Sequence, residues 1–172
     1  AENNSIDTSQ YSEIYDFSFS EKDLDSSYDE SSATKISLSD ENIAIDGNGA
    51  STEGSIITIS KEGTYILSGT LSDGQVLIAT DDNTKVHLVL SDANITCTDS
   101  AAIYAKNADK VFITLAEGSQ NFVACGYELS QEAQNDGISA AIFGKCTLSF
   151  NGEGSLNVSG ENKHGVASKD KL

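Results

Sequence analysis

Two stretches, KVHLVLSDAN (Lys85–Asn94) and KVFITLAEGS (Lys110–Ser119), decide the fold because the second repeats the pattern of the first. Each begins with Lys-Val, continues with alternating apolar residues and ends in small polar residues. Short β-branched runs separated by Gly, Asn, Asp and Ser are typical of strands joined by turns. The pattern predicts an all-β protein that is built from internal repeats.

A second set of matches gives the length of the repeat. The segments AIYAK (Ala102–Lys106), AIFGK (Ala141–Lys145) and GVASK (Gly165–Lys169) align with one another, and the first spacing is longer than the second. If the shorter spacing is the natural repeat, the longer one contains an insertion. The segment CGYELSQEAQNDGIS, residues 125–139, has the length of the difference and little strand character. We therefore predict a loop that is inserted into one repeat.

A repeat of about 24 residues favours one coil of a parallel β-helix, since a propeller blade needs about 40 residues. In a β-helix solenoid, equivalent residues of successive coils stack on one another. The alignment predicts three inward stacks: Ile103 with Ile142 and Val166, Ile113 with Leu148, and Leu115 with Phe150. It also places Lys106, Lys145 and Lys169 along one edge, where like charges repel unless an acid lies between them. We predict this solenoid over residues 34–172.

The N-terminal part of the chain differs in texture from the rest, because Ser, Asp, Glu and Tyr dominate it. We predict an extended N-terminal segment, residues 1–33, that packs on the solenoid. The opening AENNSIDTSQ is polar and small, as expected directly after a removed secretion signal, so we expect a secreted protein. The last residues, KHGVASKDKL (163–172), match the start of a new coil. We expect a fragment, or an open end that another chain caps, because natural proteins cover exposed strand edges.

Composition restricts the partners. The 172 residues include 27 acids and 10 lysines, and the net charge is −17. Such a charge repels nucleic acid and anionic membrane surfaces, and no apolar run approaches the roughly 20 residues of a membrane span. Cys97, Cys125 and Cys146 lack metal-ligand spacing, so we expect small core residues, with one disulfide plus a free thiol as the alternative.

Several segments in order resemble a known family: GTYILSGTLSDGQVLI (63–78), AAIYAKNADKVFITLAEGSQN (101–121), NGEGSLNV (151–158) and HGVASKDKL (164–172). The chain is similar to secreted bacterial carbohydrate-binding proteins, which are described as binding cellulose or acidic sugars. The resemblance implies a right-handed parallel β-helix like that of pectate lyases, bound Ca²⁺, a polysaccharide partner and a position outside the cell or on its surface, where a lipid can anchor it. Two aspartates of the family fall on Ser139 and Cys146 here, whereas Lys169 and Asp170 keep the Lys-Asp pair.

Calcium prefers six to eight oxygen ligands, which turns of successive coils can supply together. The candidates are Asp170 with Glu161 and Asn162 on the preceding turn, and Asn135 with Asp136 in the insertion. The alternative is that each of them only forms a turn, since Asn and Asp are common turn residues.

Sugar stacking needs an exposed aromatic face, and the chain has no tryptophan. Tyr127 in the insertion is the better candidate for carbohydrate binding, and Tyr104 is the second. The alternative for both is half-buried packing.

We favour calcium-assisted polysaccharide binding without catalysis. The enzymatic alternative is a calcium-dependent polysaccharide lyase with Lys145 or Lys169 as its base. An adjacent acid raises the pKa of a lysine and makes it a weaker base at neutral pH, which counts against this alternative. A further alternative is an adhesin-like surface solenoid that binds no sugar.

Overall fold

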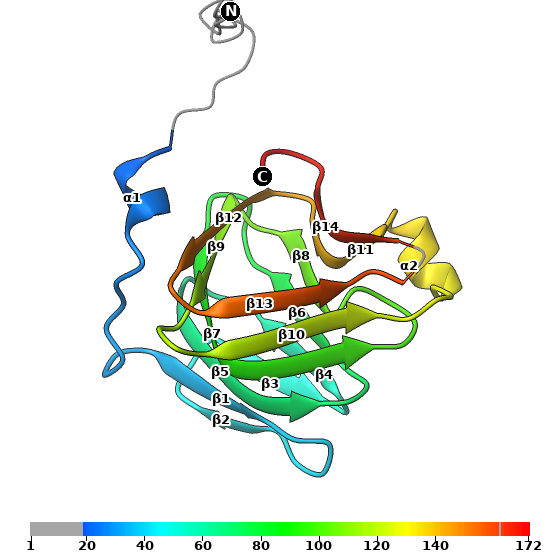
Figure 1. Cartoon of the computed structure of the whole chain (residues 1–172), viewed down its shortest axis with the longest axis horizontal. Coiled ribbons are helices and arrows are strands. Elements are labelled where there is room, and N and C mark those ends of the chain that lie inside the picture. The colour runs from blue at the N-terminus through cyan, green and yellow to red at the C-terminus, as the bar shows by residue number, and fades with distance from the viewer. Residues whose placement is uncertain (1–18, 162) are drawn as a thin grey trace, which may run out of the picture.

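The computed structural model describes residues 19–161 and 163–172 (Figure 1). Within these residues the chain forms two sheets and two short helices, α1 (Glu21–Leu24) and α2 (Gln131–Asn135). Sheet A contains β1 (Thr34–Leu38), β2 (Ala44–Asp46), β5 (Gly63–Leu71), β7 (Lys85–Cys97), β9 (Lys110–Leu115), β10 (Gln120–Cys125), β12 (Thr147–Gly152) and β13 (Ser155–Ser159). Sheet B contains β3 (Ala50–Glu53), β4 (Ile56–Ile59), β6 (Gln75–Ala79), β8 (Ile103–Asn107), β11 (Ala140–Gly144) and β14 (His164–Ser168).

The prediction of a right-handed parallel β-helix is wrong, although the chain is all-β. Both sheets are mixed, because β1 pairs antiparallel with β2 and β3 pairs antiparallel with β4. The chain reverses between β1 and β2, at residues 39–43, and again between β3 and β4, where Gly54 adopts a φ value of 59°. Residues with a side chain rarely adopt such a φ value, so Gly54 allows the tight turn that precedes β4. The repeat seen from Lys85 onward therefore does not describe the first strands.

The repeat does give the strand register at several positions. Lys85 lies beside Lys110 in the β7–β9 pair, and Ile142 lies between Ile103 and Val166 in sheet B, as predicted. The predicted pairs Ile113–Leu148 and Leu115–Phe150 are wrong by two residues, since Leu148 pairs with Val111 and Phe150 with Ile113. The chain takes four residues from Lys106 to Lys110 in β9, but only two from Lys145 to the paired residue Thr147 in β12. The sequence alignment had assumed a difference of four residues between these two connections instead of two.

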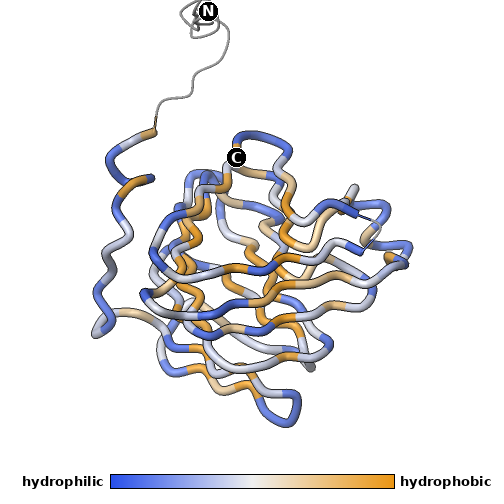
Figure 2. Tube along the Cα trace, in the orientation of Figure 1, coloured by the Kyte–Doolittle hydropathy of each residue, from blue (hydrophilic) through white to orange (hydrophobic). Residues whose placement is uncertain are grey.

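The main core lies between the two sheets. It is built from the inward side chains of both sheets, among them Leu67, Leu88 and Val111 of sheet A and Ile57, Val76 and Ile142 of sheet B. Figure 2 shows the matching alternation of apolar and polar positions along the strands. This period of two is what buries one face of each strand. The three cysteines are buried free thiols, as the composition indicated.

The insertion at 125–139 contains helix α2 and covers part of the outer face of sheet B. Ser130 caps this helix by accepting a hydrogen bond from Ala133 N at 3.3 Å. Beneath the helix lies a second apolar cluster that includes Tyr104, Leu129, Ala133 and Phe143. The insertion thus supplies a wall that stands above sheet B.

The N-terminal segment was predicted to cover the rest of the molecule, and residues 1–18 of it lie outside the described residues. We call residues 20–28 the N-terminal strap. The strap contains α1 and lies against β7, β9 and β12 on the outer face of sheet A. Among the residues that the structure describes, no helix is long and apolar enough to cross a membrane.

Candidate functional site

A groove of about 410 Å³ runs along the outer face of sheet B, beside α2. Sheet B contributes Ile56 of β4, Gln75 and Leu77 of β6, and Lys106 of β8. The turns that precede β6 and β8 supply Asp73 and the pair Asp99 and Ser100, and α2 supplies Glu132 and the C-cap residue Asp136. The insertion therefore supplies one wall of this groove.

Two sets of hydrogen bonds hold the polar walls of the groove in place. Asp73 Oδ1 accepts hydrogen bonds from Thr98 N at 2.9 Å and Thr98 Oγ1 at 3.0 Å. Gln75 Nε2 donates to Ser100 Oγ at 2.9 Å and to the Ala101 carbonyl at 2.8 Å. These bonds link successive turns and use neither Asp73 Oδ2 nor the side-chain carbonyl of Gln75. Both oxygens stay in fixed positions as acceptors for a ligand.

The groove combines acidic walls with an apolar floor. Asp73, Asp99 and Glu132 are exposed acids, while Ile56 is 43% exposed and Leu77 is half-buried. A ligand with many hydroxyl donors and apolar C–H faces matches this combination, because carboxylates accept hydrogen bonds from hydroxyl groups. An anionic ligand is repelled by the same acids.

The groove lining includes a charge cluster around Asp136. The Asp136 carboxylate lies 3.2 Å from Lys106 Nζ and 3.1 Å from Lys145 Nζ, and it accepts a hydrogen bond from Tyr104 Oη at 3.1 Å. The hydrogen bond from Lys145 is the main cause that lowers the pKa of Asp136, and burial opposes it. This acid lies between two of the three aligned lysines, as the stacking of like charges requires.

The described members of the predicted calcium ligand set hold other partners in this structure. Asp136 is paired with two ammonium groups, which leaves little room for a cation, and Asn135 hydrogen-bonds Gln131 within α2. Asp170 accepts from Thr147 Oγ1 at 2.5 Å, and Glu161 accepts from Ser159 at 3.5 Å. Asn162 lies outside the described residues. In residues 19–161 and 163–172, no group of three or more His, Cys, Asp and Glu side chains is arranged to hold a metal ion.

The two predicted sugar-binding tyrosines lie in different environments. Tyr127 is 65% exposed and lines a second hollow of about 520 Å³, together with Gln134 and Lys163. Tyr104 is only 3% exposed, and Phe143 packs against its ring at 5.9 Å between centroids. Tyr104 therefore offers no open ring face, because α2 and its cluster cover it, whereas Tyr127 does.

Lys145 and Lys169, the candidate bases of the lyase alternative, both contact other side chains. Lys145 lies near the Tyr104 ring at 5.8 Å, and its hydrogen bonds to Tyr104 and Asp136 raise its pKa. Lys169 lies near the Phe143 ring at 5.8 Å. A general base for neutral pH needs a lowered lysine pKa, so the surroundings of Lys145 act in the wrong direction.

Sequence reasoning named Asp136 and Tyr104 of the groove lining, but it missed Asp73, Gln75, Asp99 and Glu132. A signal was available, since LSDG (71–74) and CTDS (97–100) are similar turns that each precede a strand of sheet B. Their aspartates, Asp73 and Asp99, line one groove. The contribution of Glu132 had no such signal, because it depends on how the insertion folds back over the sheet.

Comparisons with known proteins agree on a family. Residues 53–172 match the family model of the carbohydrate-binding domain-containing proteins, and the chain belongs to this family. A carbohydrate-binding domain-containing protein of Acetivibrio thermocellus is 36% identical over 118 residues, which are 67% of this chain and 41% of that protein. A polysaccharide lyase-like protein from C. thermocellum, solved as a gadolinium derivative, matches with a TM-score of 0.75 and 32% identity. This match covers 79% of the present chain and 56% of the solved chain, so the chain spans about half the length of both relatives.

Proposed function

We propose that this chain binds a neutral, hydroxyl-rich polysaccharide of the cellulose type in the groove beside α2, without catalysing a reaction on it. The observation that carries the proposal is the pairing of fixed acceptors, Asp73 and Gln75, with the apolar floor at Ile56. Sugar rings present hydroxyl groups at their edges and C–H groups on their faces. Such a ring fits the walls and the floor at the same time.

Charge supports a neutral polymer over an acidic one in this groove. The chain carries a net charge of −17, and the groove adds three exposed acids near one another. Lys106 is the cation in its lining, and Asp136 pairs with it. A polymer of uronic acids would meet repulsion here, whereas a neutral glucan would not.

Calcium assistance and a position on a bacterial surface remain proposals that rest on the family resemblance. The described residues do not favour the predicted ligand set, because its members hold hydrogen bonds and ion pairs in separate places. A chelator arm in the binding experiment measures calcium dependence directly. Retention that disappears with chelator and returns with added Ca²⁺ would support it.

The test of the proposal is retention of the purified chain on insoluble cellulose and on polygalacturonate gel. The variant Asp99→Ala/Glu132→Ala should lose at least about tenfold in affinity for cellulose, since even one hydrogen bond to a charged group contributes about 1.5–3 kcal/mol. Glu117→Ala/Glu153→Ala is the matched control, because it removes two exposed acids outside the groove lining. Tyr127→Ala tests whether the polymer also reaches the second hollow.

The outcomes separate the three candidate functions. No retention of the wild-type chain on either polymer would overturn the proposal and favour a structural role. Unsaturated uronate products released from polygalacturonate would favour the lyase. Equal retention of the groove variant and the wild type would mean that the polymer binds elsewhere.

A further inference from the structure

A carboxylate of the chain itself occupies a built site on the outer face of sheet A. The Asp23 side chain is 7% exposed, and its Oδ1 lies against Lys110 Nζ, whose side chain is 19% exposed. Lys110 Nζ also lies 5.0 Å from the centroid of the Phe112 ring. Burial raises the pKa of Asp23, but hydrogen bonds from Lys110, Ser20 and Ser149 outweigh it, and the net shift is well downward. We call Lys110, Phe112 and Ser149 the carboxylate seat.

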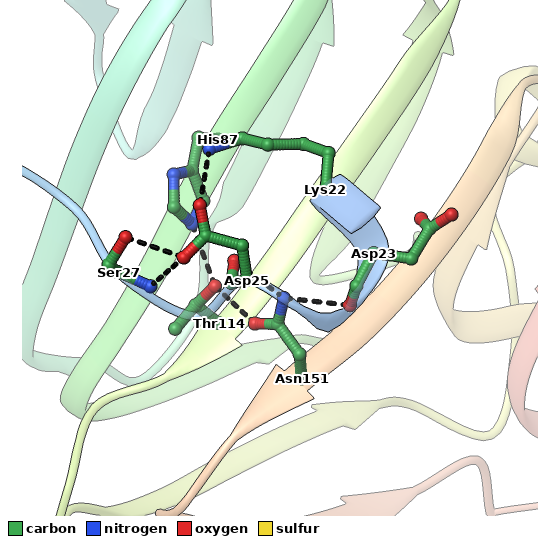
Figure 3. Close-up of polar contacts among 7 residues, drawn as sticks. All are labelled: Lys22, Asp23, Asp25, Ser27, His87, Thr114 and Asn151. Carbon is green, nitrogen blue, oxygen red and sulfur yellow. Dashed lines mark hydrogen bonds and ion pairs between the residues drawn. The ribbon is translucent and has the colours of Figure 1, made fainter. Parts of the chain in front are cut away.

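The seat belongs to a regular pattern of side chains across three parallel strands. In the registers of β7, β9 and β12, His87, Phe112 and Ser149 form one row, and Thr114 and Asn151 belong to the next. His87 Nε2 and Thr114 Oγ1 are 2.7 Å apart, and Thr114 Oγ1 donates to Asn151 Oδ1 at 2.5 Å. Figure 3 shows this chain of polar side chains beneath the strap. The sheet therefore presents a cation, a ring and several hydrogen-bonding groups on one face.

The strap lies on this face through few contacts. Asn151 Nδ2 donates to the carbonyls of Asp23 and Asp25 at 3.1 and 3.2 Å (Figure 3). Tyr28 meets the His87 ring edge-on at 6.2 Å between centroids. The Asp25 carboxylate accepts hydrogen bonds from Ser27 N and Oγ and from Lys22 Nζ, all within the strap. Leu24 is 71% exposed, so it adds little apolar anchoring. One buried carboxylate, one ring edge and two hydrogen bonds from Asn151 attach the strap, so we expect it to open at a lower free energy than the sheet itself.

The strap has the chemistry of an acidic polymer. Residues 20–28 contain three acids and one lysine, and they present a carboxylate, two carbonyls and the Tyr28 ring to the sheet. A uronic-acid oligosaccharide offers the same groups: carboxylates at regular spacing, ring and hydroxyl oxygens, and C–H faces for Phe112. Its carboxylate can replace that of Asp23 on Lys110 with the same charge balance.

We propose that the N-terminal strap is an internal stand-in for an acidic oligosaccharide, and that a uronic-acid polymer displaces it to bind Lys110, Phe112 and Ser149 on sheet A. The proposal takes from the proposed function only the ligand class, a sugar polymer, and adds a second site for acidic chains. It also explains how a chain of net charge −17 can bind an acidic polymer, because the carboxylate seat offers the partly buried cation of Lys110.

The test uses the full chain and trigalacturonate as the probe, with cellotriose as the neutral control. Asp23→Ala should bind trigalacturonate at least about tenfold more tightly than the wild type, because the apparent affinity is reduced by the fraction of molecules whose site is open. Asp25→Ala is the matched control, since it removes the same charge from the strap and leaves the seat filled. Asp23→Ala/Lys110→Ala should lose the gain.

A second measurement tests the wild-type chain without any substitution. The amides of Asp23 and Asp25, which donate to the carbonyls of Ser20 and Glu21 at 2.9 and 3.1 Å, should exchange faster with solvent deuterium when trigalacturonate is added. Cellotriose should leave their exchange unchanged. Equal trigalacturonate affinity of Asp23→Ala and Asp25→Ala, or unchanged exchange at saturation, would overturn the proposal. Cooperative urea unfolding of each variant checks that sheet A is intact.

The two proposals fail separately. Cellulose retention through the groove, combined with no gain in Asp23→Ala, overturns only the role of the strap. A trigalacturonate gain that depends on Lys110, combined with no loss in the groove variant, overturns only the neutral site.

Discussion

Replacing Asp136 by Asn tests whether one carboxylate holds the lysine row of sheet B together. The substitution keeps an acceptor oxygen for Tyr104 Oη and removes the charge that pairs with Lys106 and Lys145. The two lysine side chains are 45% and 35% exposed, so each ion pair is worth about 0.5 kcal/mol. The repulsion that remains between the lysines adds a similar amount. We expect Asp136→Asn to lower the free energy of unfolding by about 1–1.5 kcal/mol at pH 7 and low salt.

The difference in unfolding free energy between the wild type and Asp136→Asn should depend on both salt and pH. High salt screens the attraction in the wild type and the repulsion in the variant, so the difference in unfolding free energy should shrink at about 1 M NaCl. Neighbouring lysines lower the pKa of Asp136 from its ordinary value of 3.8, so its contribution is present above that value. The contribution disappears as the pH falls below 3.8 and passes through the lowered pKa of the folded state.

The assay is equilibrium urea unfolding at pH 7 and at decreasing pH, each in low and high salt. Lys35 and Glu30 form an exposed ion pair at 2.8 Å, and Glu30→Gln is the control that should change the free energy of unfolding by less than about 0.5 kcal/mol. A difference between wild type and Asp136→Asn that is independent of both salt and pH would refute the electrostatic reasoning.

Three further predictions concern the core and its connections. Ile142→Ala, at a fully buried position of sheet B, should lower the free energy of urea unfolding by about 3 kcal/mol. Ile56→Ala, at a 43% exposed position, should lower it by less than about 1 kcal/mol, and similar losses for both variants would contradict this packing. Burial raises the pKa values of Cys97 and Cys146 to about 11, so both thiols should stay unmodified by a thiol reagent at pH 7.5 until the chain unfolds. Gly126→Ala should destabilise the chain by more than about 1 kcal/mol, because its new methyl group would collide with a backbone carbonyl of the preceding turn, and an unchanged urea midpoint would exclude that collision.

The sequence predicted the local elements better than the global form. The stretches that begin at Lys85 and Lys110 were aligned correctly, because each is a strand of sheet A whose equivalent residues meet in register. The solenoid was wrong, since nothing in the repeat itself described the antiparallel pairs β1–β2 and β3–β4. A sequence repeat predicts the pairing of the strands that lie within it. Strands outside the repeat can pair in the opposite direction.

The candidate site was only partly predictable for a similar reason. Tyr127 follows β10 and is exposed, as a residue outside the strands can be, while Tyr104 became buried when the insertion folded over it. The position of the strap was even harder to predict from the sequence. Asp23 and Lys110 are far apart in the chain, and a helix of four residues has no detectable hydrophobic period. Contacts of that kind depend on tertiary packing and carry no local pattern.

The most direct test of the central claim is a map of where a neutral sugar touches the chain. In backbone NMR spectra, added cellotetraose should shift the signals of Gln75, Ser100 and Glu132 along the groove, while signals of β1 and β2 stay in place. Shifts that grow with sugar concentration and gather on these three residues are the predicted result. No shifts at saturating sugar, or shifts that gather on another face of the molecule, would contradict the account.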